Sequence, residues 1–92
     1  MLVLPRKHVM TIYQLTPTEQ SAIWKLVGDV RERLLAGLTP DGFNIGFNDD
    51  IAAGQTVSHA HVHIIPRRQG DVADPRGGIR WVIADNAPYW KK

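Results

Sequence analysis

The chain has 92 residues, of which 43% are hydrophobic and 22% charged, and its formal net charge is +2. This length predicts one small domain, and the apolar content is typical of a globular chain and does not suggest disorder. The sequence contains no cysteine, which excludes disulfides and thiolate metal sites, and its apolar stretches are too short to span a membrane.

Charge and the first residues set expectations for partners and location. Basic residues form three separate pairs, Arg6-Lys7, Arg67-Arg68 and Lys91-Lys92. Isolated pairs are typical of solvated ends of elements and not of a nucleic-acid-binding stripe. The apolar run that starts at Met1 is broken by Pro5, too early for the apolar core of a signal peptide. We therefore expect a cytoplasmic protein that binds neither nucleic acid nor membrane.

The first half of the chain predicts a strand followed by a long helix. A short strand runs from Leu2 to Leu4 and ends at Pro5. The segment Thr16-Pro17-Thr18-Glu19 has the form of a capping box with proline at the first helical position. Apolar residues then recur at helical spacing up to Leu38, which predicts one amphipathic helix of about five turns with Gly37 as its C-cap.

The second half predicts strands. Apolar and polar residues alternate over 43–48, after the turn-forming Pro40-Asp41-Gly42, and alternate again from about Val57 to Ile65. Two such strands joined by a short loop pair antiparallel in most proteins. A further short strand is expected over 79–83. The sequence therefore predicts an α+β fold with an antiparallel sheet and one main amphipathic helix, as a single domain over residues 1–92.

The most informative feature is a row of histidines, His59, His61 and His63, separated by Ala60 and Val62. On a strand, every second residue points to the same face, so the imidazoles share one face and the apolar residues face the core. With Phe43, Ile45 and Phe47 on that core face as well, Asn48 is expected on the histidine face.

Three interpretations of this row compete. The histidines can be structural, although imidazoles in strict alternation rarely arise from packing alone. They can bind zinc, but the outer two Cα atoms of a straight strand lie about 13 Å apart. They can also perform covalent catalysis at phosphorus, with one imidazole as nucleophile and its neighbours as donors to phosphate oxygens. The preceding Gly54-Gln55-Thr56 suits this chemistry, because it can offer backbone N–H groups, an amide and a hydroxyl to an anion.

The segment Ala53-Gly54-Gln55-Thr56-Val57, followed by the histidine row and Ile64-Ile65-Pro66, resembles the signature of the histidine triad (HIT) family, including its Hint-like and Fhit-like branches. The resemblance implies an α+β homodimer that hydrolyses or transfers nucleotides at the α-phosphate of nucleoside phosphoramidates or dinucleoside polyphosphates. It implies a nucleotide substrate and no obligatory cofactor or metal. It also implies that the strands which precede Leu2 in family members, with part of the nucleoside pocket, are lacking here.

The resemblance also assigns roles to individual residues. His61 matches the nucleophile that forms a nucleotidyl-histidine intermediate, and His59 and His63 match its catalytic partners. Phosphate and nucleotide contacts are implied for four residues: Asn48, Gln55, Thr56 and His8, the last matching a fourth histidine of the Hint-like branch. Two alternatives stay open, a non-catalytic nucleotide-binding or interaction domain and a zinc hydrolase with histidine ligands.

Overall fold

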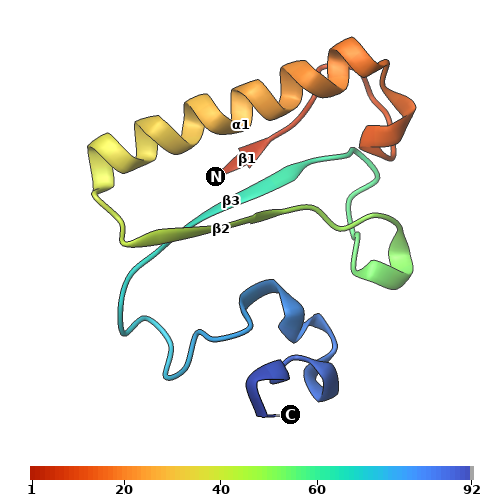
Figure 1. Cartoon of the computed structure of the whole chain (residues 1–92). Helices are drawn as coiled ribbons and strands as arrows, with labels where there is room; N and C mark the ends of the chain where they lie inside the picture. The colour runs from red at the N-terminus through yellow and green to blue at the C-terminus, as the bar shows by residue number, and fades with distance from the viewer. Residues whose placement is uncertain (92) are drawn as a thin grey trace.

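The structure, a computed structural model, describes residues 1–91 as a three-stranded antiparallel sheet with one long helix beside it (Figure 1). Strand β3 (Val62–Arg67) lies between β1 (Leu2–Val3) and β2 (Gly42–Gly46). The helix α1 spans Pro17–Leu38, and no helix within residues 1–91 is long and apolar enough to cross a membrane. The predicted α+β class, with an antiparallel sheet and one main helix, is confirmed.

The start of α1 follows the predicted capping box, whereas its end does not fall at the predicted glycine. The Thr16 hydroxyl accepts a bond from the Glu19 N–H (3.2 Å), and the Glu19 carboxylate accepts one from the Thr16 N–H (2.9 Å). These bonds lower the pKa of Glu19. Gly37 lies inside the helix, so its prediction as C-cap was wrong. The cap is Thr39, in the left-handed region at φ 47°, and Pro40 follows it.

The core lies between α1 and one face of the sheet. Val62 and Ile64 of β3 are fully buried, and Ala60 is 5% exposed, as the alternation predicted. Ile23 and Val27 of α1 belong to the same core cluster, while Phe43, Ile45 and Phe47 pack against it partly buried. Because side chains alternate along a strand, His63 points to the sheet face that α1 does not cover.

β3 begins later than the sequence predicted. The expected strand over 57–65 is a strand only from Val62, so His59 and His61 precede it. β1 pairs Leu2 with His63 and Val3 with Val62. Extending this register by two residues would place Pro5 opposite Ala60, where a proline has no N–H to donate to a ladder. The Ala60 N–H bonds to the Val9 carbonyl instead (2.8 Å).

The remaining elements are short 3-10 helices. Two precede β3, η1 (Ile12–Gln14) and η2 (Ile51–Ala53), and three follow it: η3 (Gly78–Val82), η4 (Ala84–Asn86) and η5 (Tyr89–Lys91). The predicted strand over 79–83 was therefore wrong. Gly77 and Gly78 take positive φ angles of 89° and 48°, and the Arg80 N–H bonds back to the Gly77 carbonyl (2.9 Å), which curls the chain.

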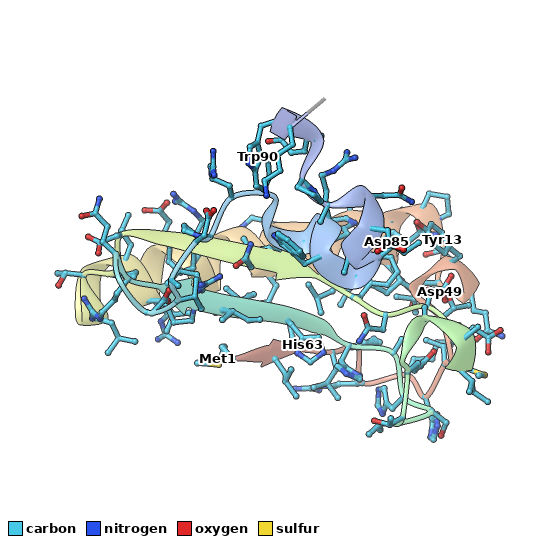
Figure 2. All side chains as sticks on the ribbon, turned by 90° about the horizontal axis from the view of Figure 1, so that it is seen from below. Met1, Tyr13, Asp49, His63, Asp85 and Trp90 are labelled. Carbon is cyan, nitrogen blue, oxygen red and sulfur yellow. The ribbon has the colours of Figure 1, made fainter. Side chains whose placement is uncertain are left out.

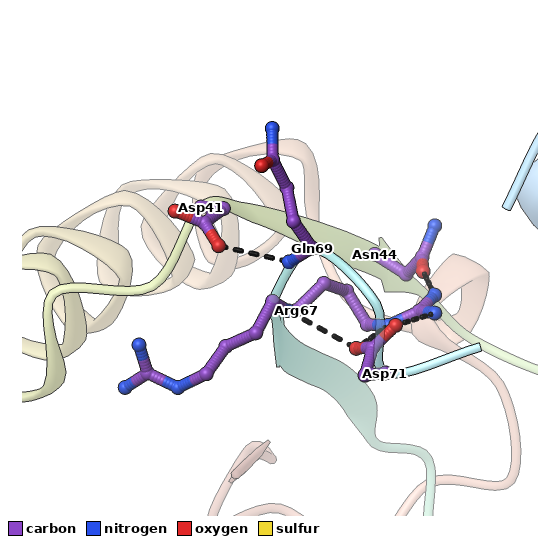
Figure 3. Close-up of polar contacts among 6 residues, drawn as sticks. Asp41, Asn44, Arg67, Gln69 and Asp71 are labelled. Carbon is purple, nitrogen blue, oxygen red and sulfur yellow. Dashed lines mark hydrogen bonds and ion pairs between the residues drawn. The ribbon is translucent and has the colours of Figure 1, made fainter. Parts of the chain in front are cut away.

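The far end of β3 is tied to its surroundings by Arg67 (Figure 3). Its guanidinium donates two bonds to the Asp71 carboxylate (2.7 and 2.8 Å) and one to the side-chain oxygen of Asn44 on β2. Arg67 holds the pKa of Asp71 well below its usual range. A pocket of about 250 Å³ opens here, lined by residues of both strand ends and not by the histidines.

The capping box yields a prediction for stability. Thr16→Ala removes the acceptor of the Glu19 N–H, so we expect the free energy of unfolding to fall by about 1 kcal/mol. Thr18→Ala is the matched control, since Thr18 lies two residues further on, inside α1, and Ala is a better helix former than Thr. Urea denaturation of both variants measures the difference. Equal stability of the two variants would contradict the capping role.

Candidate active site

His61 is oriented by the backbone that precedes it. Its Nδ1 lies 2.8 Å from the carbonyl oxygen of His59. A carbonyl can only accept, so Nδ1 carries the hydrogen and donates it. The neutral ring then has no hydrogen on Nε2, whose lone pair is free. The ring is half-buried and fixed in direction, which is the state that a nucleophilic imidazole requires.

His59 is also oriented by a backbone carbonyl, in this case one from the segment that follows β1. Its Nε2 lies 2.7 Å from the carbonyl oxygen of Pro5, which fixes Nε2 as the donor nitrogen. The ring stacks on His8 with 5.0 Å between centroids and 13° between planes. The structure therefore brings the fourth predicted histidine, which is exposed, into contact with the first member of the row.

His63 is the one histidine of the row inside β3, the central strand, and Figure 2 labels it close to Met1. It pairs with Leu2 of β1 and Gly46 of β2. Its ring meets that of His61 edge-on, with 4.9 Å between centroids and 74° between planes. Burial, then the neighbouring His61 and the N-terminal ammonium, lower the pKa of His63, so its neutral form is favoured.

The predicted phosphate-binding residues are arranged differently from one another. Asn48 and Thr56 are exposed, and the Asn48 amide nitrogen lies 3.9 Å from where a Cβ on Gly54 would be. Gln55 is 6% exposed and turned inward. Its side-chain oxygen accepts from the Asp50 N–H, and its nitrogen donates to the carbonyls of Met10 and Val57.

Sequence reasoning found His8 but missed the three backbone carbonyls that residues 5–10 contribute to the site. The carbonyls of Pro5, Val9 and Met10 each accept a bond from the segment that carries Gln55, His59 and Ala60. The signal was available in part, because a proline in a strand predicts where a ladder stops. Within the part of the chain that the structure describes, no group of three histidine, aspartate or glutamate side chains is placed to hold a metal ion.

Comparisons with known proteins identify the family and its fold. The HIT domain family model matches residues 1–70. A bis(5'-nucleosyl)-tetraphosphatase (asymmetrical) of Schizosaccharomyces pombe is 38% identical over 73 residues, which are 79% of this chain and 40% of the relative. A HIT family protein of Bacillus anthracis has a TM-score of 0.70 and 40% identity over 75% of this chain and 49% of its own.

A zinc-bound histidine triad family protein of Mycobacterium smegmatis has a TM-score of 0.69 and 31% identity, over 98% of this chain and 70% of its own. The chain spans about two fifths of the length of the yeast relative. The family model covers the sheet, the helix, the histidine row and its carbonyl partners. On this evidence the chain belongs to the HIT domain family.

Proposed function

We propose that this chain hydrolyses or transfers nucleotides at the α-phosphate of dinucleoside polyphosphates or nucleoside phosphoramidates, through a covalent bond to His61. The observation that carries the proposal is the bond from His61 Nδ1 to the His59 carbonyl, because it leaves Nε2 unprotonated. The activity in the name of the yeast relative, hydrolysis of a bis(5'-nucleosyl) tetraphosphate, supports the same class of reaction.

In the first step the Nε2 lone pair of His61 attacks the α-phosphorus. A nitrogen–phosphorus bond forms, and the bond from phosphorus to the leaving group breaks, with the electron pair going to the leaving group, which solvent protonates. His61 now carries a positive charge. The His59 carbonyl, 2.8 Å from Nδ1, stabilises that charge through a stronger, charge-assisted hydrogen bond.

In the second step a water oxygen attacks the same phosphorus. The nitrogen–phosphorus bond breaks, its electron pair returns to Nε2, and the proton of the water passes to solvent. Another hydroxyl in place of water would give transfer instead of hydrolysis. His63, favoured in its neutral form, supplies a ring N–H to the phosphate beside the nucleophile. We assign Asn48 and Thr56, both exposed, to the phosphate oxygens, and His8 to holding the His59 ring.

His61 provides the first test. We expect His61→Asn to abolish the nucleotide adduct and to reduce turnover about 10³-fold or more, since a nucleophile cannot be replaced by its neighbours. Intact-mass spectrometry after incubation with an activated adenylate detects the adduct, and circular dichroism checks the fold. His59 and His63 substitutions should reduce turnover less. Full activity in His61→Asn would refute the mechanism.

Excess chelator separates this mechanism from the zinc alternative, which the zinc-bound relative makes worth testing. In a zinc hydrolase the metal generates the attacking hydroxide, so chelation abolishes turnover. In the proposed mechanism the adduct and the turnover persist. Loss of both on chelation, with recovery on adding zinc, would favour the alternative.

His63 yields a prediction for pH. Its pKa is lowered in the folded state, so the unfolded chain binds the proton more readily. The free energy of unfolding should therefore be highest above about pH 6.5 and should fall as the pH drops from there through the folded pKa. His63→Gln should lose less stability than the unaltered chain between pH 7.5 and 5.5. Urea denaturation at both pH values measures this, and identical losses would contradict it.

We further propose that the protein works as a cytoplasmic homodimer. Large apolar side chains are exposed near the C-terminus, including Trp81 (45%), Ile83 (60%) and Tyr89 (51%). A cluster of this kind on a short chain is a liability for a monomer. We expect a dimer at micromolar concentration by light scattering, and Trp81→Ser to shift the balance toward monomer. A monomer at every accessible concentration would refute this.

A further inference from the structure

The first two histidines of the row lie outside β3, so the strand ladder does not fix them. The chain before β3 is fastened instead to residues 5–10. The His59 ring bonds to the Pro5 carbonyl (2.7 Å), and the Ala60 N–H bonds to the Val9 carbonyl (2.8 Å). A third bond involves Met10, the residue after Val9, whose carbonyl accepts from the Gln55 side-chain nitrogen (2.9 Å).

Gln55 has no hydrogen left to offer a ligand. An amide side chain has two N–H donors, and here one goes to the Met10 carbonyl and the other to the Val57 carbonyl (3.0 Å). Its oxygen accepts from the Asp50 N–H (2.8 Å). Among the residues that the structure describes, Gln55 is the one buried polar or charged residue, at 6% exposed. Buried and fully bonded, the amide is part of the internal framework.

We propose that Gln55 is a positioning residue for the triad and does not bind phosphate through its side chain. The proposal rests on the function proposed above and refines the role of one residue in it. The amide joins Met10 to the segment that leads into His59, beside the Ala60 bond to Val9. Together these bonds determine where residues 57–60 lie.

The position of residues 57–60 matters for the chemistry because the His59 carbonyl orients His61. If this segment shifts, the acceptor of the His61 Nδ1 hydrogen shifts with it. Nε2 then points away from the phosphorus that it attacks. Displacement of a reacting group by about 1 Å can cost about 10²-fold in rate. The backbone of His63 should not move with this segment, because β1 and β2 pair with it on both sides.

The test compares Gln55→Met, which removes all three bonds at similar length, with Gln55→Glu, which keeps the acceptor for Asp50 and loses both donors. Gln20→Met is the matched control, since its amide donates to the Leu15 carbonyl (3.0 Å) at the start of α1. Histidine-selective NMR of the ligand-free protein should show the His59 and His61 ring signals shifted more than those of His63, whose backbone the strand pairing holds. The control should shift none of them.

Kinetics give the second measurement. We expect kcat to fall by about 10²-fold in either Gln55 variant, with KM changed by less than about threefold. A side chain that binds phosphate directly would instead raise KM and leave the ligand-free histidine signals unchanged, which would overturn the proposal. Since the NMR measurement needs no turnover, it stands even if no nucleotide adduct is ever found and the proposed reaction fails.

If the Gln55 variants do not fold, a measurement on the unaltered chain still tests the proposal. The side-chain N–H groups of Gln55 should exchange slowly with solvent, because both are buried and bonded. Their signals should stay in place on addition of AMP or inorganic phosphate. Fast exchange in the free protein, or a large shift on addition of phosphate, would overturn the proposal.

Discussion

Pro5 sets the point at which strand pairing gives way to side-chain bonding, and the geometry of the histidine row depends on it. At Val62 and His63, β3 is hydrogen-bonded to β1. Where the register would bring Pro5 opposite Ala60, the proline has no hydrogen to donate. Its carbonyl is left to accept from the His59 ring (2.7 Å). Because the proline nitrogen has no hydrogen, strand pairing ends here, and the Pro5 carbonyl is an acceptor for a functional side chain.

Backbone carbonyls, which carry no net charge, accept the ring hydrogens of two histidines. The carbonyls of Pro5 and His59 hold one nitrogen of His59 and of His61, respectively. A neutral acceptor orients a ring without the attraction that a carboxylate would exert on an imidazolium. The carbonyl thus adds no charge beside the nucleophile, and its hydrogen bond strengthens as positive charge develops on the His61 ring. Burial lowers the pKa of the neighbouring His63, which favours the neutral form of that ring.

The sequence predicted those parts of the fold that depend on local pattern. The capping box at Thr16, the helix to Leu38 and the buried positions of Val62 and Ile64 all follow from residue type and spacing. The sequence-based prediction failed where tertiary context decides. Alternation continues through His59 and His61, yet within residues 1–91 no strand pairs with them. The histidine row was visible in the sequence. The inward turn of Gln55 was not, because its partner Met10 lies 45 residues away.

The C-terminal segment, residues 71–91, supplies none of the histidines but lies close to the strand that pairs with His63. The HIT family model ends at residue 70, so residues 71–91 lie beyond it. Gly46 nevertheless pairs with His63, and the Ile79 side chain lies 3.7 Å from where a Cβ on Gly46 would be. Figure 1 shows this segment on the β2 side of the sheet, away from α1. Residues that the family model matches supply the imidazoles, while a residue beyond that match lies against Gly46, the β2 partner of His63. Because Ile79 is 56% exposed and lies beside the β2 partner of His63, a substitution there changes the surroundings of the triad and none of its imidazoles.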